Sequence, residues 1–233
     1  MEISEGIEIV DTALWLRREK VLIINDLHLG YEQALQRKGI LVPKFQLEEI
    51  KEKMTRLIEN VKPTMLIING DLKHEFGTVL RQEWQEVLEF LDLVLLKVKN
   101  IIIIKGNHDP LLKFITEKRA IRVVTDYLIS DTLIVHGDQL VDTKAKRIII
   151  GHEHPAVVMR EGSKREKYKC FLKGRWKKKE LIAVPSFNPL LEGTDVLKEE
   201  LLSPFLKDIQ NFEVYIVSKG EVFGFGKVKG LQG

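Results

Sequence analysis

Short polar clusters rich in Asp, Asn and His recur along the sequence at points where apolar runs end. The clusters are Asp26-Leu27-His28, Gly70-Asp71, Gly106-Asn107-His108-Asp109, His136-Gly137-Asp138 and Gly151-His152-Glu153-His154. Five of the six histidines lie in these clusters, and only His74 lies outside them. Carboxylate, amide and neutral imidazole groups are ligands for Mn, Fe, Zn, Ni or Co, whereas a magnesium site would consist mostly of oxygen. The clusters therefore predict a transition-metal centre.

A pair of cations would suit phosphoester chemistry at such a centre. Two cations about 3.5–4 Å apart can polarise phosphoryl oxygens, lower the pKa of a shared water and stabilise the attacking and leaving oxygens of an in-line displacement. A carboxylate must then bridge the ions, and Asp71 is the natural candidate because it lies between the ligand groups in the sequence. Glycines at 70, 106, 137 and 151 allow the backbone to approach the ions closely.

Strands and helices alternate in the half of the chain that carries the first clusters. Continuous apolar runs predict two or three strands within 7–25 and further strands at 64–69 and 101–105. Apolar residues spaced by three and four predict helices over 45–61 and about 79–98, and Pro110 can open a short helix over 110–117. The carboxyl ends of strands in open α/β sheets converge on one crevice, so the clusters can meet there.

The second half of the chain is mostly β. Strands are predicted at 120–124, 132–136, 147–151, 156–160, 168–173 and 180–185, followed by a closing hairpin within 213–228. Ser203 and Pro204 resemble an N-cap and first helical residue, which predicts a helix to about Asn211. This order of elements predicts an α/β protein with two sheets in its core.

Composition limits the class of protein. With 233 residues, of which 44% are hydrophobic, the chain suits one domain over 1–233. Apolar runs of four to six residues are far shorter than the roughly 20 that a membrane span needs, and no secretory signal is visible. The lone Cys170 cannot form an internal disulfide, so a cytoplasmic location is expected by default. The oligomeric state is left open.

The motifs DLHLG, NGDLKH, GNHD, VHGD and GHEH, in that order, resemble the calcineurin-like metallophosphoesterase superfamily. The resemblance spans residues 26–154 and implies a four-layer αββα sandwich of two mixed β-sheets flanked by helices. It implies that one metal is bound by Asp26, His28 and His154, and the other by Asn107, His136 and His152. It further implies that Asp71 bridges the metals, and that His108 contacts the phosphate and protonates the leaving oxygen, oriented by Asp109.

Within that superfamily, DLHLGYE, GDLKHEFG and VPSFNPLLEGTD are most similar to small prokaryotic phosphoesterases related to DNA-repair nucleases, including a ligase-associated endonuclease. We therefore expect phosphodiester hydrolysis by a metal-activated hydroxide, with Mn as the first choice of metal and DNA as a candidate substrate. Two alternatives stay open. One is a hydrolase of small phosphomonoesters or cyclic nucleotides, and the other is a non-catalytic interaction module, as in a retromer-type sorting subunit.

A basic segment covers residues 160–179, with ten Lys or Arg and two Glu. It predicts nucleic-acid contacts from Lys177, Lys178 and Lys179, with aromatic residues interleaved for stacking. The alternative is a hairpin with one solvated face and its aromatic side chains buried. Five other residues have two interpretations each. His74, Asp138 and Glu153 either orient the metal ligands or are ordinary polar residues. Ser186 and Asn188 either approach the site from a loop or cap a turn.

Overall fold

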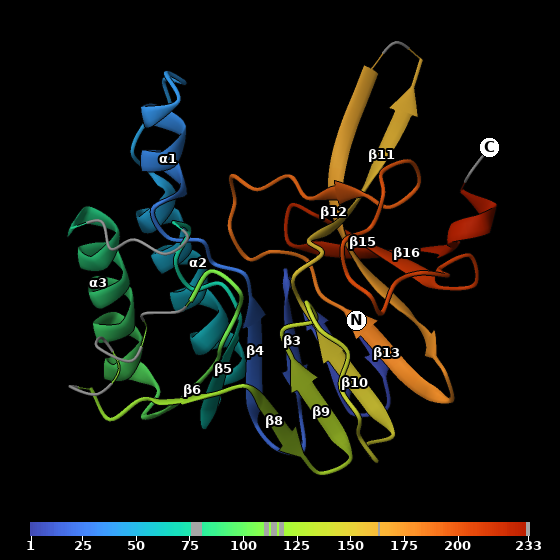
Figure 1. Ribbon diagram of the computed structural model, residues 1–233, viewed down its shortest axis with the longest axis horizontal. Helices are drawn as coiled ribbons and strands as arrows, with labels where there is room; N and C mark the ends of the chain where they lie inside the picture. Colours follow the sequence, from blue (N-terminus) through green and yellow to red (C-terminus); the bar gives the residue numbers. More distant parts are fainter. Residues whose placement is uncertain (76–80, 110–111, 113–115, 117–118, 163, 232–233) are drawn as a thin grey trace.

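The computed structural model describes the whole chain except residues 76–80, 110–111, 113–115, 117–118, 163 and 232–233. Two mixed β-sheets pack face to face, and helices cover the outer face of the first sheet (Figure 1). The fold is therefore the predicted α/β sandwich of two mixed sheets flanked by helices. No helix in the described part of the chain is long and apolar enough to cross a membrane.

The first sheet has seven strands in sequence order. They are β1 (Glu2–Ser4), β2 (Ile7–Val10), β3 (Ala13–Leu16), β4 (Val21–Asn25), β5 (Met65–Asn69), β6 (Asn100–Ile104) and β7 (Arg122–Val124). Strands β1 to β4 are antiparallel, whereas β4 to β7 run parallel. The apolar run of β4 is buried along its whole length because both faces of the sheet are covered.

Three α-helices have described bounds in this half of the molecule: α1 (Tyr31–Arg37), α2 (Gln46–Val61) and α3 (Arg81–Lys97). Helix α2 buries Ile50, Met54, Leu57 and Ile58, which is the face expected from their spacing. These residues pack with α3 against the outward side chains of β4 to β6. The predicted helices at 45–61 and 79–98 are thus confirmed within the described residues, whereas α1 was not predicted.

The second sheet has nine strands. They are β8 (Asp126–Ile129), β9 (Thr132–Val135), β10 (Arg147–Ile150), β11 (Pro155–Glu161), β12 (Lys164–Trp176), β13 (Lys179–Ala183), β14 (Thr194–Asp195), β15 (Glu213–Ser218) and β16 (Glu221–Lys227). Strands β9, β10 and β13 are mutually parallel, and most other pairs are antiparallel. The predicted strands and closing hairpin are present, and β8 and β14 are additional.

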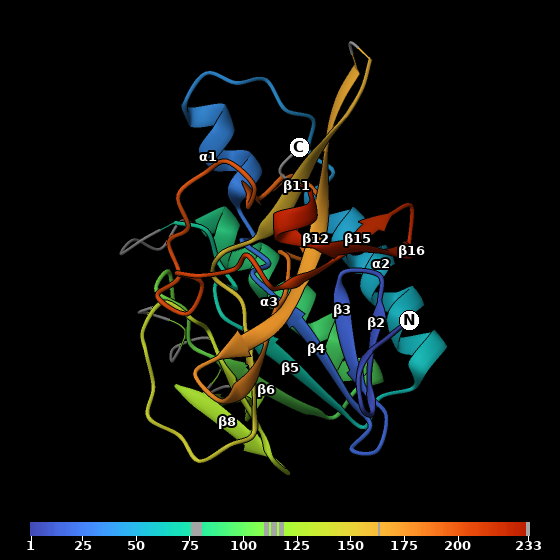
Figure 2. The same cartoon turned by 90° about the vertical axis from the view of Figure 1, so that its right-hand side faces the viewer.

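An apolar cluster between the sheets joins them, with Ile23 and Ile67 from the first and Ile149 and Phe171 from the second. Figure 2 looks onto the second sheet, with β12 and β15 drawn in front of the first sheet. Another cluster covers the outer face of the second sheet, where an irregular segment (196–212) and the 3₁₀ turn η2 (Val228–Gly230) pack on its strands. A single domain over 1–233 stays a prediction.

The helix predicted from Ser203 to about Asn211 is wrong, because this stretch consists of turns and irregular backbone. The Ser203 hydroxyl donates to the carbonyl of Gly137 at 2.7 Å, so it holds the segment to the sheet instead of capping a helix. Phe205, Leu206 and Ile209 are all buried against the second sheet. Burying three closely spaced large side chains outweighs local helix propensity here. The short helix expected over 110–117 falls mostly outside the described residues.

Candidate metal centre

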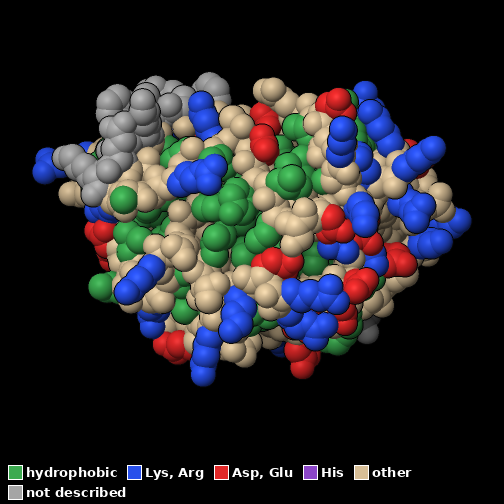
Figure 3. Space-filling model, turned by 90° about the horizontal axis from the view of Figure 1, so that it is seen from below, with side chains coloured by type: hydrophobic (Ala, Val, Ile, Leu, Met, Phe, Trp, Pro, Cys, Tyr) green, Lys and Arg blue, Asp and Glu red, His purple; other side chains and the backbone are tan. Residues whose placement is uncertain are grey.

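Parallel strand ends bring the polar clusters together at one edge of the sandwich. Asn25, Asn69 and Ile104 end β4, β5 and β6 in matched register, so Asp26, Asp71 and Asn107 emerge side by side. In the second sheet, Val135 and Ile150 are paired, which places His136 and His152 at the corresponding edge. Seen from below, from the opposite end, no histidine is visible at the surface (Figure 3).

The first ligand group consists of Asp26, His28 and His154. The Nε2 atoms of His28 and His154 lie 3.3 Å apart, and His154 Nε2 lies 3.5 Å from Asp26 Oδ2. Asp26 and His28 are buried, while His154 is partly exposed. One face of the group is therefore accessible to a ligand from solvent.

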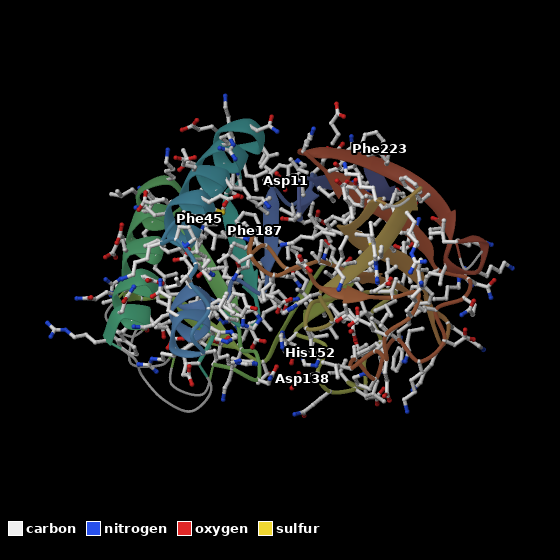
Figure 4. The ribbon with its side chains drawn as sticks, turned by 90° about the horizontal axis from the view of Figure 1, so that it is seen from above. Asp11, Phe45, Asp138, His152, Phe187 and Phe223 are labelled. Carbon is white, nitrogen blue, oxygen red and sulfur yellow. The ribbon has the colours of Figure 1, made fainter. Side chains whose placement is uncertain are left out.

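The second ligand group consists of Asp71, His136 and His152. His136 Nε2 lies 3.2 Å from His152 Nδ1 and 2.9 Å from Asn107 Oδ1. The Asn107 side chain therefore lies beside this group, and its role as a metal ligand, which the resemblance implied, stays a prediction. His152 and Asp138 lie together between the helical half and the second sheet (Figure 4).

Asp71, a member of the second group, also faces the first. Its Oδ2 atom is 3.6 Å from His28 Nε2 in the first group and 3.5 Å from His136 Nε2 in the second. Its Oδ1 atom accepts the backbone N–H of His108 at 2.9 Å, which fixes the orientation of the carboxylate. One carboxylate oxygen thus faces ligand atoms of both groups, which is the position that a bridging ligand requires.

The site residues adopt an uncommon backbone conformation. Asp26, His28, Asp71, His152 and His154 all have φ between 38° and 65°, a left-handed region that few non-glycine residues occupy. Glycines next to the site leave space for the ligand side chains. A Cβ at Gly70 would lie 1.9 Å from His136 Nδ1, and one at Gly106 would lie 2.1 Å from Asp71 Oδ1. Side chains at these two positions would displace the ligands.

Burial keeps the imidazoles neutral. It lowers the pKa of His28 well below the usual value, an effect that neighbouring histidines increase, and it lowers the pKa of His152 to about 4. Both rings therefore offer a lone pair at neutral pH. Burial and the charge of Asp26 raise the pKa of Asp71 to about 9, so its carboxyl holds a proton in the protein alone. A nearby dication would favour the charged carboxylate and so offset both the burial and the repulsion from Asp26.

Unsatisfied polar atoms also fit bound cations. Asp26 Oδ1 and His136 Nδ1 lie 3.5 Å from each other, and both are buried without a hydrogen bond in the described part of the chain. Buried polar groups without partners are costly, so such a pair needs a reason. Ligand atoms around a cation with bonds of about 2.1 Å are separated by roughly 3.0–3.4 Å. The contacts of 2.9 to 3.6 Å within and between the two groups match that spacing.

A family model described as Calcineurin-like phosphoesterase matches residues 19–218. The chain belongs to this family. Among solved structures, the Pseudomonas putida nuclease MPE is 19% identical, with 94% of each chain covered and a TM-score of 0.70. The Escherichia coli phosphoesterase Yfce is 13% identical, with 87% of this chain and 96% of that chain covered and a TM-score of 0.45. No curated protein matches the sequence.

This calcineurin-like phosphoesterase is thus a metal-dependent hydrolase with a dinuclear divalent metal centre. The likeness to the nuclease shows that nearly the whole chain shares its fold. Both ligand groups lie within the matched residues, at the strand ends of that fold. The sequence motifs therefore predicted the family correctly.

His108 and Asp109 of the phosphoesterase differ in what they contact. His108 Nδ1 lies 2.6 Å from the carbonyl oxygen of His74, and the His28 and His108 rings meet edge to face at 5.1 Å. The Asp109 carboxylate instead accepts backbone N–H groups of residues 72, 73 and 106. The orienting contact to the His108 ring thus comes from His74, and Asp109 holds together the loops that carry Asp71 and Asn107.

Three residues support the phosphoesterase site: Ser186 and Asn188, for which the sequence left two interpretations open, and Glu83, which was assigned no role. Ser186 Oγ donates to the carbonyl of Asp26 at 2.7 Å, and Asn188 Nδ2 donates to the carbonyl of Leu27 at 2.9 Å. Both side chains are fully buried. Glu83 of α3 accepts the N–H groups of residues 74 and 75. The motif VPSFNP was the available signal for Ser186 and Asn188, whereas no sequence signal distinguished Glu83.

The structure does not bring every predicted residue to the metal centre. Lys177, Lys178 and Lys179 lie at the turn between β12 and β13, beside Lys146 at the start of β10. The ligands follow the other end of β10, roughly 15 Å away at about 3.3 Å per residue. Their aromatic neighbours Tyr168, Phe171 and Trp176 pack in the apolar clusters, as the alternative interpretation expected. Glu153 accepts the N–H of Ser203 at 2.8 Å and thus anchors a neighbouring segment.

Proposed function

We propose that this phosphoesterase hydrolyses phosphodiester bonds with the help of two divalent cations. Manganese is the metal that we expect at both positions. The observation that carries the proposal is the position of Asp71 Oδ2, at 3.6 Å from His28 Nε2 and 3.5 Å from His136 Nε2. Asp26, His28 and His154 would hold one cation, and Asn107, His136 and His152 the other. When bound, the cations would polarise the phosphoryl oxygens and lower the pKa of a shared water.

His108 supplies the proton for the leaving oxygen in this proposal. Its Nδ1 lies 2.6 Å from the His74 carbonyl, and a carbonyl can only accept, so Nδ1 carries a hydrogen. The Nε2 atom is then the one that exchanges a proton with the substrate. Histidine suits the role because its unperturbed pKa of about 6.5 allows proton transfer near neutral pH.

A hollow beside the metal centre supports a diester rather than a monoester. It has a volume of about 530 Å³, and Asn107, Asp138 and Leu140 are among its lining residues. A phosphodiester carries an organic group on each side of the phosphorus, and the hollow provides room for one of them next to a ligand of the second group. DNA is the proposed natural substrate class, whereas small phosphomonoesters and cyclic nucleotides are the alternative. A cytoplasmic location stays a prediction.

Hydrolysis of bis-p-nitrophenyl phosphate by the manganese-loaded protein tests the proposal, with p-nitrophenyl phosphate as the monoester comparison. We expect the diester to be the better substrate. The variant His108→Ala should lose about 10²–10⁴-fold in turnover, the usual contribution of a positioned proton donor, while binding as much manganese as the parent. Equal turnover in His108→Ala and its parent would remove His108 from the mechanism. An inert parent that binds manganese would favour the non-catalytic module.

A further inference from the structure

Strands β11 and β12 form a two-stranded arm that extends beyond the body of the molecule (Figures 1 and 2). Their pairing runs from Ala156 opposite Lys169 at the base to Glu161 opposite Lys164 near the tip. The arm starts at Pro155, directly after the first-group ligand His154. Its base is therefore part of the metal centre, and its tip lies outside the body.

Two arginines face each other across this arm. Arg160 and Arg165 are direct cross-strand partners, which places their Cβ atoms about 4.5–5.5 Å apart. Both side chains are exposed, and neither forms an ion pair with any described residue. Like charges directly opposite one another destabilise a sheet, so folding does not explain the pair. An anion bound at the arm would offset the repulsion.

The neighbouring cations of the arm are already paired. Lys164 Nζ lies 2.6 Å from Glu166, and Lys167 Nζ lies 3.1 Å from Glu199. Lys169 at the base donates to the backbone carbonyls of Ser186 and Asn188. Unlike Lys164 and Lys167, Arg160 and Arg165 therefore have no ion-pair partner among the described residues.

A second projection leaves the metal centre in a different direction. Helix α1 begins three residues after His28, and His28 Nε2 lies 3.3 Å from His154 Nε2 at the base of the arm. Figure 1 shows α1 and the arm diverging on the side of the molecule where β4 ends. The loop after α1 carries the exposed Lys38 and Lys44, and Leu41 is 97% exposed between them. Basic residues thus stand on both sides of the metal centre.

We propose that the arm binds the sugar–phosphate backbone of a nucleic-acid strand, with Arg160 and Arg165 as the phosphate contacts. The inference rests on the proposed diesterase function and names its substrate as a polymer. Arg160 is six residues from His154, a reach of about 20 Å at about 3.3 Å per residue, so a small phosphoester at the metals cannot touch both. Guanidinium groups suit phosphates because their planar donor geometry allows two hydrogen bonds at once.

The test compares two double variants that each remove two positive charges. Arg160→Ala with Arg165→Ala changes the arm, and Lys177→Ala with Lys178→Ala changes the exposed turn at the other end of the sheet. Binding of a fluorescent single-stranded oligonucleotide is measured in EDTA over a range of salt concentrations. The arm variant should bind more weakly, with a log–log salt slope smaller by about 1.4, because each lost phosphate contact removes about 0.7. The turn variant should keep the parental slope.

The melting temperature and the manganese affinity of both variants serve as folding controls. The arm variant should melt at the parental temperature or above it, because the change removes a like-charge pair. A parental salt slope in the arm variant, or an equal reduction in both variants, would overturn the proposed contact. Failure of the diesterase proposal is a separate result, since it would appear as an inert parent with bis-p-nitrophenyl phosphate.

Discussion

Asp71 holds a proton in the metal-free protein because its carboxylate is buried beside Asp26 and Asp109, which raises its pKa to about 9. The unfolded chain would release that proton near its usual pKa of 3.8. A raised folded-state pKa contributes stability that is complete below about pH 4 and is lost as the pH rises towards 9. Cation binding displaces the same proton, so affinity for metal rises with pH.

This linkage predicts that stabilisation by manganese increases with pH between 7 and 8.5. Relative to Asp71→Asn, the metal-free parent should lose up to about 1.4 kcal/mol of stability per pH unit for the one proton on Asp71. His28 and His152 do not titrate in this window, because burial lowers their pKa values far below it. Thermal unfolding of the metal-free and manganese-loaded protein measures the difference. Lys169, whose pKa burial lowers to about 7, adds the same pH dependence to both proteins, so the parent and Asp71→Asn should diverge as the pH rises, and parallel profiles would contradict the assignment.

The segment after β13 shows how one element supports another. Ser186 and Asn188 donate to backbone carbonyls of the Asp26–His28 loop, and the N–H of Phe187 donates to the carbonyl of Asn25 at 2.8 Å. These side chains are fully buried, so losing one bond leaves a buried carbonyl unsatisfied at a cost of about 1–3 kcal/mol. The segment therefore holds the first ligand group in position.

Asn188→Ala should weaken manganese binding at the first group by about 10–100-fold, which is typical when a group that orients a ligand is removed. Isothermal titration would show one weakened and one unchanged binding event. Ser4→Ala is the matched control, because Ser4 Oγ makes a short hydrogen bond to Glu180 and is likewise nearly buried, but at the other end of the fold. That control should lower the melting temperature without changing either affinity. Unaltered binding in Asn188→Ala would show that the segment serves folding alone.

Element prediction from sequence succeeded where the pattern was strong and failed where tertiary contacts decided. The runs that became β4, β5 and β6 and the periodic face of α2 carried clear signals. The segment around Ser203 has the signature of a helix start. The Ser203 hydroxyl nevertheless donates a hydrogen bond to the carbonyl of Gly137, and the apolar residues of the segment are buried against the second sheet. Local residue preferences do not include such long-range contacts.

At the scale of the whole molecule, sequence indicated the ligands but not how the site is held together. Spacing after the strands pointed to the clusters that contain all seven proposed ligands, because parallel strand ends meet at one edge. Three features of the site depend on the complete fold. They are the left-handed backbone conformations of five of these residues, the contact between His108 and the His74 carbonyl, and the placement of Lys177 away from the metals. The charge count marked residues 160–179 as basic, and only the strand pairing separated the arm from the turn.

The central claim is that two cations share Asp71 between two ligand groups. Anomalous diffraction from a crystal of the manganese-loaded protein tests it most directly. We predict two metal peaks that both contact Asp71, one held by Asp26, His28 and His154 and the other by Asn107, His136 and His152. A single peak, or two peaks of which only one contacts Asp71, would contradict the account.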